Sequence, residues 1–167
     1  MKKIIVILLV MFLIFFLIRC SNTFEGYDGL VEKARAEIQL AGIENMDIQI
    51  AGSTDVNGRS LVWFVTGNEY QKHSYFPIEF EVIKKNDDKF RFVKRYKAYN
   101  VAQDIAALPW NGYCFVINND KCVKILLTDS DGNTQEIEVS DKLPTVCSTD
   151  IIPQSCTFLD KDGNEIR

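Results

Sequence analysis

The chain of 167 residues contains a single histidine, His73, and lacks the short motifs that carry catalytic or cofactor chemistry. It has no glycine-rich phosphate-binding loop, no dinucleotide-binding fingerprint, no G-x-S-x-G nucleophile motif and no C-x-x-C pair. One histidine is too few for a histidine-rich metal site, and without C-x-x-C nothing indicates a zinc or redox motif. We therefore expect no metal ion and no cofactor, and we assign no catalytic residue.

A surplus of positive charge is also missing. Three of the 19 basic residues lie in the first twenty positions, so residues 21–167 carry 16 basic and 23 acidic side chains, a net charge of −7. A nucleic-acid-binding domain needs a basic footprint. The composition therefore argues against a nucleic-acid partner.

Two acidic turns, at residues 128–133 and 159–164, resemble each other and raise the question of calcium. An EF-hand loop needs its first ligand four residues before the carboxylate that precedes the glycine. Leu127 and Phe158 occupy those positions and cannot ligate a cation. Turns that join β-strands explain both segments better.

What the sequence does have is one long apolar run. Lys2 and Lys3 precede fifteen apolar residues, positions 4–18, which end at Arg19. A charged start followed by 7–15 apolar residues is typical of a secretory signal. As a helix the run would be about 22 Å long, short of the roughly 30 Å hydrocarbon core of a bilayer. However, no pair of small residues of the A-x-A kind follows it.

Three modes of membrane attachment or export stay open. The run is an uncleaved anchor if Lys3 and Arg19 reach the two interfaces and the bilayer thins locally. It is a cleaved signal if a peptidase removes it. The sequence LIRC also resembles the lipobox of bacterial lipoproteins: Leu17 and Ile18 match, Arg19 departs from the pattern, and Cys20 is the candidate lipidation site. Each mode places residues 21–167 on the extracytoplasmic side, since the lysines favour a cytoplasmic N-terminus.

The region after position 20 contains an even number of cysteines, in a location compatible with oxidation. Four cysteines allow three pairings, and the most local one joins Cys114 to Cys122 and Cys147 to Cys156. The alternative is that all four are small core residues with free thiols. The sequence leaves both open.

The fold class follows from a change of hydrophobic period along the chain. Residues 28–41 predict an amphipathic helix, with Asp28 as the N-cap and Gly42 after its end. Its apolar residues recur at helical spacing: Leu30, Ala34, Ile38 and Ala41. After this segment apolar and polar residues alternate, starting with Ile48 and Ile50, which is typical of a β-strand. Asn57-Gly58 is a strong signal for a hairpin turn. One helix followed by hairpin-linked strands indicates a single α+β domain, residues 21–167, in which the helix packs on a mainly antiparallel sheet.

Further elements are expected along the rest of the chain. Strands are predicted at residues 60–65, 74–85, 89–99 and 134–139, and the first of these is expected to be buried on both faces. Residues 101–108 predict a short helix that Pro109 ends. Residues 113–118 and 121–129 read as a hairpin.

The strand at residues 89–99 is the strongest candidate for a binding site. In a regular extended chain, the cations at alternate positions point to one face and the aromatic residues to the other. The candidate anion-binding residues are Lys89, Arg91, Arg95 and Lys97, which could bind phosphate-rich material such as lipid headgroups or wall polymers. The simpler alternative is cross-strand pairing with carboxylates: Glu79 lies opposite Arg95, and Glu81 lies diagonal to Arg91.

Aromatic residues gather in the middle of the chain, and most must be core. The segment WNGY is expected to be an exposed turn, which makes Trp110 and Tyr113 candidate protein-interface residues. His73 is expected at the surface or at a hairpin edge. The composition and the apolar run together favour a membrane-tethered, non-enzymatic binding or envelope-associated module with a protein or anionic envelope partner. The alternative is an envelope-acting hydrolase with an unrecognised site.

Overall fold

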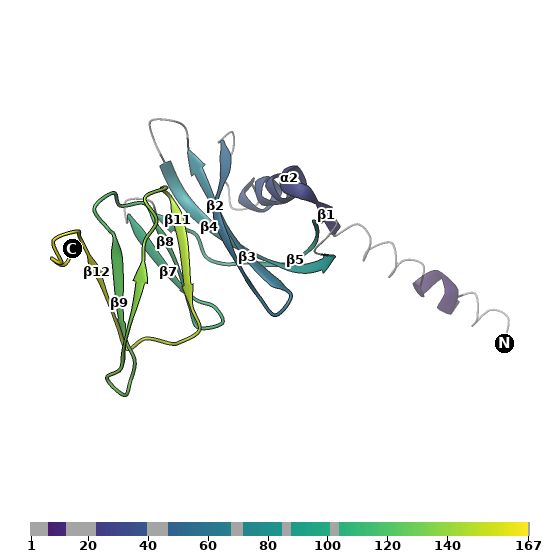
Figure 1. Ribbon diagram of the computed structural model, residues 1–167. Helices are drawn as coiled ribbons and strands as arrows, with labels where there is room; N and C mark the ends of the chain where they lie inside the picture. Colours follow the sequence, from purple (N-terminus) through teal and green to yellow (C-terminus); the bar gives the residue numbers. More distant parts are fainter. Residues whose placement is uncertain are drawn as a thin grey trace.

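The structure, a computed structural model, describes residues 7–12, 23–39, 47–67, 72–84, 88–100 and 104–166. It is an α+β fold in which one helix and three antiparallel sheets lie in successive layers (Figure 1). In order along the chain the elements are β1 (Thr23–Glu25), α2 (Gly26–Gln39), β2 (Ile48–Val56), β3 (Arg59–Gly67), β4 (Lys72–Lys84), β5 (Lys89–Arg95), β6 (Tyr99–Asn100), β7 (Ile105–Pro109), β8 (Tyr113–Ile117), β9 (Lys124–Thr128), β10 (Thr134–Glu138), β11 (Thr145–Thr149) and β12 (Ser155–Leu159).

The largest sheet, here called sheet A, has the strand order β1-β5-β4-β3-β2, and β6 pairs with β4. Its central strands are buried on both faces, as expected for residues 60–65. The Asn57-Gly58 turn joins β2 to β3 as predicted. Both of its residues have positive φ angles, 50° and 74°, which is the geometry of a two-residue hairpin turn.

Helix α2 covers one face of sheet A. Its buried residues are Leu30, Ala34 and Ile38, three of the positions whose helical spacing predicted it. They pack against Phe64 and Phe80. The helix and its packing on an antiparallel sheet are therefore confirmed.

The other face of sheet A packs on a second sheet, sheet B, with the order β11-β8-β7. Trp63 and Tyr75 from sheet A meet Leu108 and Val116 from sheet B in this core. The two sheets approach each other closely at Gly52, where an added Cβ would lie 2.8 Å from a methyl carbon of Val146. Only a glycine permits this approach.

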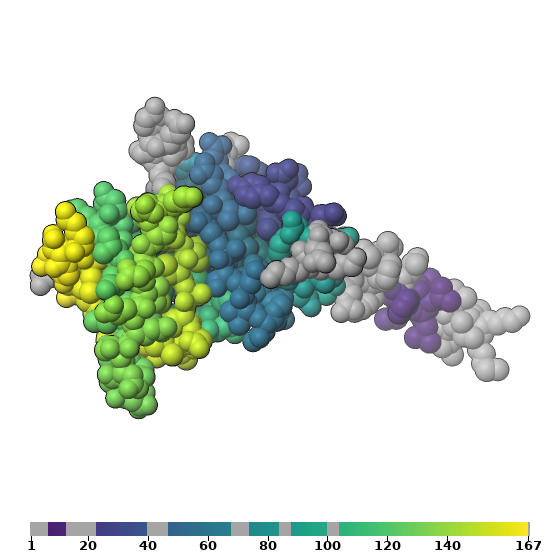
Figure 2. Space-filling model, viewed as in Figure 1, coloured from purple at the N-terminus to yellow at the C-terminus, as the bar shows by residue number. Residues whose placement is uncertain are grey.

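A third sheet, sheet C, has the order β10-β9-β12 and packs on the far side of sheet B. The core between sheets B and C contains Phe115, Ile117, Ile125 and Leu127. Sheet B therefore separates two hydrophobic cores, and successive residues of β8 point alternately into one and the other. Figure 2 shows the sheets in contact along the length of the molecule.

Two expected elements are wrong. Of the helix expected at residues 101–108, the described part, from Asp104, enters strand β7: Ala106 and Leu108 face one core, while Ile105 and Ala107 face the other. Burial on both faces overrides a local helical preference. The hairpin expected between residues 113–118 and 121–129 does not form, because β8 already has β7 and β11 as neighbours.

The expected N-terminal membrane helix falls mostly outside the described residues. Positions 7–12 are helical and exposed. Within the described ranges, no helix has both the length and the apolar character needed to cross a bilayer. Cys20 also lies outside the described residues.

Candidate binding surface

The four candidate anion-binding residues do not form one ladder, because β5 contains a β-bulge. Glu79 pairs with Lys94 while the next residue, Phe80, pairs with Phe92, so Val93 is an extra residue in β5. A bulge reverses the alternation of side chains beyond it. The expected pairing of Glu79 with Arg95 is therefore wrong.

The bulge distributes the cations over different environments. Arg91 lies opposite Glu81, and its Nη1 is 3.0 Å from a carboxylate oxygen of Glu81. Arg95 turns to the helix side, where its Nε is 3.9 Å from Glu37 of α2. Lys89 lies across from Glu25 of β1, and Lys97 is exposed in the segment that follows β5.

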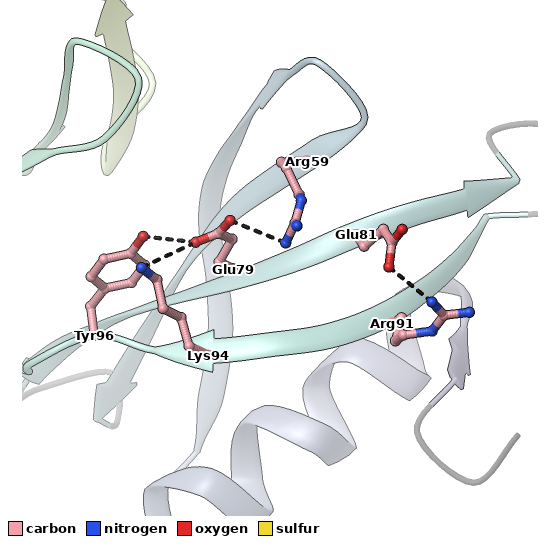
Figure 3. Close-up of polar contacts among 6 residues, drawn as sticks. All are labelled: Arg59, Glu79, Glu81, Arg91, Lys94 and Tyr96. Atoms are coloured by element: carbon pink, nitrogen blue, oxygen red, sulfur yellow. Dashed lines mark hydrogen bonds and ion pairs between the residues drawn. The ribbon is translucent and has the colours of Figure 1, made fainter. Parts of the chain in front are cut away.

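A polar site with several partners is centred on Glu79, at the middle of β4 (Figure 3). The residue is only 9% exposed. Its carboxylate accepts a 2.7 Å hydrogen bond from the Tyr96 hydroxyl and lies 3.4 Å from Nη1 of Arg59 and 3.7 Å from Nζ of Lys94. We call these four residues the Glu79 cluster. Sequence reasoning did not identify Arg59 or Tyr96 as part of it.

Three strands bring the Glu79 cluster together. The hairpin turn places Arg59 at the start of β3, opposite Glu81, while Lys94 arrives from β5 just after the bulge. The pKa of Tyr96 is raised, chiefly because the ring is partly buried, so the phenol keeps its proton and donates a hydrogen bond to the carboxylate. The Lys94 ammonium lies 4.5 Å from the centre of the same ring.

Chemically, this surface is paired with itself. Each carboxylate on this face of β4 has a cation of β3 or β5 as its neighbour: Glu79 has Arg59 and Lys94, and Glu81 has Arg91. Cross-strand pairs of this kind contribute about 0.2–1 kcal/mol each and need no ligand. The arrangement supports the simpler of the two interpretations of the basic strand.

The turn expected at residues 110–113 forms between β7 and β8, but the expected exposure of Trp110 is wrong. The Trp110 side chain is 7% exposed and packs in the core between sheets A and B. The turn is tight because Gly112, with a φ of 102°, lies against the end of β11, where an added Cβ would be 2.1 Å from the Thr149 carbonyl oxygen. Tyr113 is half-buried, with its ring 5.7 Å from that of Phe115.

The four cysteines are free thiols in the structure. Cys114 is buried between sheets A and B, where the Trp63 indole donates a hydrogen bond to its sulfur at 3.1 Å. Cys122, Cys147 and Cys156 lie in the other core, beyond sheet B. The Cys114–Cys122 pairing that the sequence left open is therefore wrong, whereas the Cys147–Cys156 pairing stays a prediction.

Burial makes all four thiols weak nucleophiles. It raises the pKa of Cys114 to about 12 and also raises the pKa values of Cys122, Cys147 and Cys156. At neutral pH these groups stay protonated, whereas the thiolate is the reactive form. His73 lies on β4, but its side chain is outside the described residues.

The two acidic turns adopt the same hydrogen-bonded structure. In the first, the Asp129 carboxylate accepts hydrogen bonds from the backbone amides of Asp131 and Asn133 and from the Asn133 side chain. In the second, Asp160 accepts the equivalent bonds from Asp162 and Asn164. These bonds lower the pKa values of both aspartates. The carboxylates close the turns, and no group of metal-binding side chains is found in the part of the chain that the structure describes.

A small cleft, which sequence reasoning missed, lies between the β8–β9 connection and the segment that follows β10. Its volume is about 130 Å³, and its polar lining includes Asp120, Ser140 and Asp141, with Cys122 beside them. These residues are brought together from two loops, so no local sequence signal marks them. Ligand pockets usually measure about 300–1,000 Å³, so this cleft has room only for water molecules or a very small group.

Comparison with known proteins adds no further assignment. No protein-family model, no curated protein and no solved structure matches this chain.

Proposed function

We propose that the chain is a membrane-tethered extracytoplasmic protein whose folded region acts as a non-enzymatic binding or envelope-associated module. The observation that carries the proposal is the apolar run at positions 4–18, which leads within five residues into β1 of the folded region. A protein built in this way is held at a membrane by one end while its sheets are displayed on one side of it.

The self-pairing of the charged groups on sheet A counts against a catalytic role for this surface. General acid–base catalysis needs a carboxylate or another titratable group in reach of a substrate. In the Glu79 cluster the carboxylate is buried under its own partners, and Glu81 is occupied by Arg91. These ion pairs link the neighbouring strands β3, β4 and β5 and neutralise one another's charges.

For the alternative function, an envelope-acting hydrolase, the cleft beside Cys122 is the candidate site among the described residues. Two carboxylates, of Asp120 and Asp141, and the hydroxyl of Ser140 line it. However, about 130 Å³ does not accommodate a sugar ring together with its neighbours or a peptide segment. The binding module is therefore the better-supported of the two.

Two measurements on the full-length chain test the proposal. A C-terminal fusion to a reporter that is active only outside the cytosol is expected to be active, and the protein is expected in the membrane fraction. The intact mass after extraction then separates the attachment modes: retention of Met1 means an anchor, and a diacylglycerol group on Cys20 means a lipoprotein. Loss of about twenty residues without lipid means export without tethering. A reporter active only in the cytosol would refute the proposal.

The partner is sought by crosslinking in intact cells. Crosslinked products that contain this chain and a second envelope protein, and that disappear when surface residues are changed, support a binding module. Turnover of purified envelope material by the purified full-length chain, lost in an Asp120→Asn/Asp141→Asn variant, would support the hydrolase instead.

A further inference from the structure

Strand β7, at the edge of sheet B, has one open side. In an antiparallel ladder alternate residues of a strand bond to a given neighbour, and the residues between them point their main-chain groups to the opposite side. The Asn118 amide donates to the Asp104 carbonyl at 2.7 Å, so the even-numbered positions of this strand are the ones that bond to β8. The N–H and C=O groups of Ile105 and Ala107 therefore point away from β8. Among the described residues, no strand pairs with β7 on that side.

The other edge strands carry features that discourage further pairing, whereas β7 does not. Edge strands are commonly protected by charged side chains, bulges or short length. β10 carries exposed glutamates, β2 contains a β-bulge and is tied to β11 by a hydrogen bond between two hydroxyls, and β1 has only three residues. The sequence of β7, IAALP, has no charge, and its Pro109 faces the open side, the place in a sheet where a missing N–H is tolerated.

The layers above and below β7 extend one strand beyond it. In sheet A, β2 contacts β11 and β3 contacts β8, so β4 lies on the side of β7, and β6 pairs with β4 at the edge away from β3. In sheet C, β10 contacts β11, so β12 lies on the side of β7. The Ile166 amide then donates to the Phe158 carbonyl at 2.8 Å on the outer edge of β12. The described part of the middle layer is therefore one strand narrower than its neighbours; Figure 1 shows the order of the layers.

A strand added to β7 would have apolar side chains on both of its faces. On the side of sheet A, Tyr99 of β6 is partly buried against the core that contains Leu108. On the side of sheet C, Phe158 and Ile166 are partly buried against the core that contains Phe115. A charged side chain placed there would lose its hydration without gaining a partner. An uncharged segment therefore suits this edge.

The same layers disfavour a second copy of this chain as the occupant. A second β7 would arrive with its own sheets A and C. Those sheets would have to occupy the space that β6 and residues 165–166 take up beside the first β7. A single extended segment brings no such layers with it.

We propose that the open edge of β7 binds an extended, uncharged segment of a partner protein, which pairs with Ile105 and Ala107 as a fourth strand of sheet B. This inference rests on the binding module proposed above and deepens it by naming the kind of partner and the strand that receives it. In strand addition the main-chain hydrogen bonds supply affinity, and the side chains at alternate positions supply specificity.

Amide hydrogen exchange, measured residue by residue on the full-length chain in detergent micelles, tests the site. The probe is a synthetic peptide of alternating valine and threonine with blocked ends, and the control peptide has proline in place of threonine, which prevents a ladder. Without peptide, the amides of Ile105 and Ala107 should exchange faster than those of Ala106 and Leu108. When the probe occupies about 90% of the chains, exchange at Ile105 and Ala107 should slow about tenfold, because it then comes from the free tenth. The control peptide should change nothing.

A pair of variants gives a second test. Ala107→Pro removes the donor at the centre of the open edge and should abolish the effect of the probe on the Ile105 amide. The matched control is Thr134→Pro: in β10 the odd-numbered positions bond to β9, so the Thr134 N–H also faces an open edge, but on another sheet. This variant should respond to the probe as the unmodified chain does. Tryptophan fluorescence checks that both variants fold, and if Ala107→Pro does not, the exchange measurement on the unmodified chain decides alone.

The outcomes separate this inference from the proposed function. No slowing at Ile105 and Ala107 at the highest soluble concentration of the probe, or equal slowing by the proline peptide, would refute the site. Slow exchange at both amides before any peptide is added would mean that the edge is already covered, which would also refute it, and the particle mass would then distinguish a second copy from a segment of the same chain. None of these results bears on the membrane attachment. A reporter active only in the cytosol, together with binding of the probe at β7, would instead refute the proposed compartment and leave the strand-binding edge in place.

Discussion

Replacing Glu79 with glutamine is expected to destabilise the fold by about 1–2 kcal/mol, because it removes a buried charge whose partners are already in place. The Tyr96 hydroxyl donates a 2.7 Å hydrogen bond to this carboxylate, and a hydrogen bond to a charged group contributes about 1.5–3 kcal/mol. Glutamine retains an acceptor for Tyr96, so part of this stabilisation survives. The side chain of Arg59 is 42% exposed, so the loss of its ion pair with Glu79 should lower the free energy of unfolding by at most about 1 kcal/mol.

A matched control lies two residues away. Glu81 is on the same strand and the same face, has one cation partner at 3.0 Å, and is 43% exposed at its side chain. Solvent screens such a pair, so Glu81→Gln should cost about 0.5 kcal/mol or less. The comparison isolates the effect of burial and of the Tyr96 hydrogen bond from the effect of removing one negative charge.

The assay is urea unfolding of the full-length chain in detergent micelles, followed by tryptophan fluorescence. Both tryptophans report on the folded core, since Trp63 is fully buried and Trp110 is 7% exposed. A double-mutant cycle with Tyr96→Phe should give a coupling free energy of about 1 kcal/mol. Equal destabilisation by Glu79→Gln and Glu81→Gln, or a coupling near zero, would refute the role given to the Glu79 cluster.

Three further predictions concern the turns and the thiols. Gly112→Ala should lower the free energy of unfolding in urea by about 3 kcal/mol or more, because the added Cβ would overlap the backbone at the end of β11. The control is Gly132→Ala: its φ is also positive (82°), but nothing lies within 4 Å of the added Cβ, so the loss should be about 1 kcal/mol. Maleimide at pH 7.5 should label Cys156 well before Cys114, whose pKa is about 12, and equal rates would contradict the burial described. The hydrogen bonds of the Asp129 carboxylate lower its pKa in the folded protein. Its ionised form therefore stabilises the fold fully at pH values above the ordinary pKa of about 3.9, and this stabilisation is lost as the pH falls through the lowered pKa. The stability difference between the unmodified chain and Asp129→Asn should therefore be constant at neutral pH and shrink in acid; a difference that grows in acid would contradict this.

Elements with a strong local signal could be predicted from the sequence. The helix was marked by apolar residues at helical spacing, including Leu30, Ala34 and Ile38, and the first hairpin by Asn57-Gly58. These features depend on residues within a few positions of one another. Their geometry therefore needs little information from the rest of the chain.

The candidate surface could not be predicted, because it depends on a single extra residue. Val93 is β-branched and gives no sign of a bulge, yet it decides that Lys94, not Arg95, meets Glu79. Trp110 was misplaced for a related reason: its segment reads as a turn, but the layer that buries its ring comes from a distant strand. Both errors concern contacts between strands that the local pattern does not determine.

The central position of sheet B has a consequence for how the protein comes apart. Val116 points into one core and Phe115 into the other, so sheet B is a wall that both cores share. Separating sheet C from sheet B would expose Phe115 and Ile117 to water, and removing sheet B would expose Trp63. The layers should thus melt in a single cooperative step, and shortened versions that stop before β7 should aggregate rather than persist as smaller folded units.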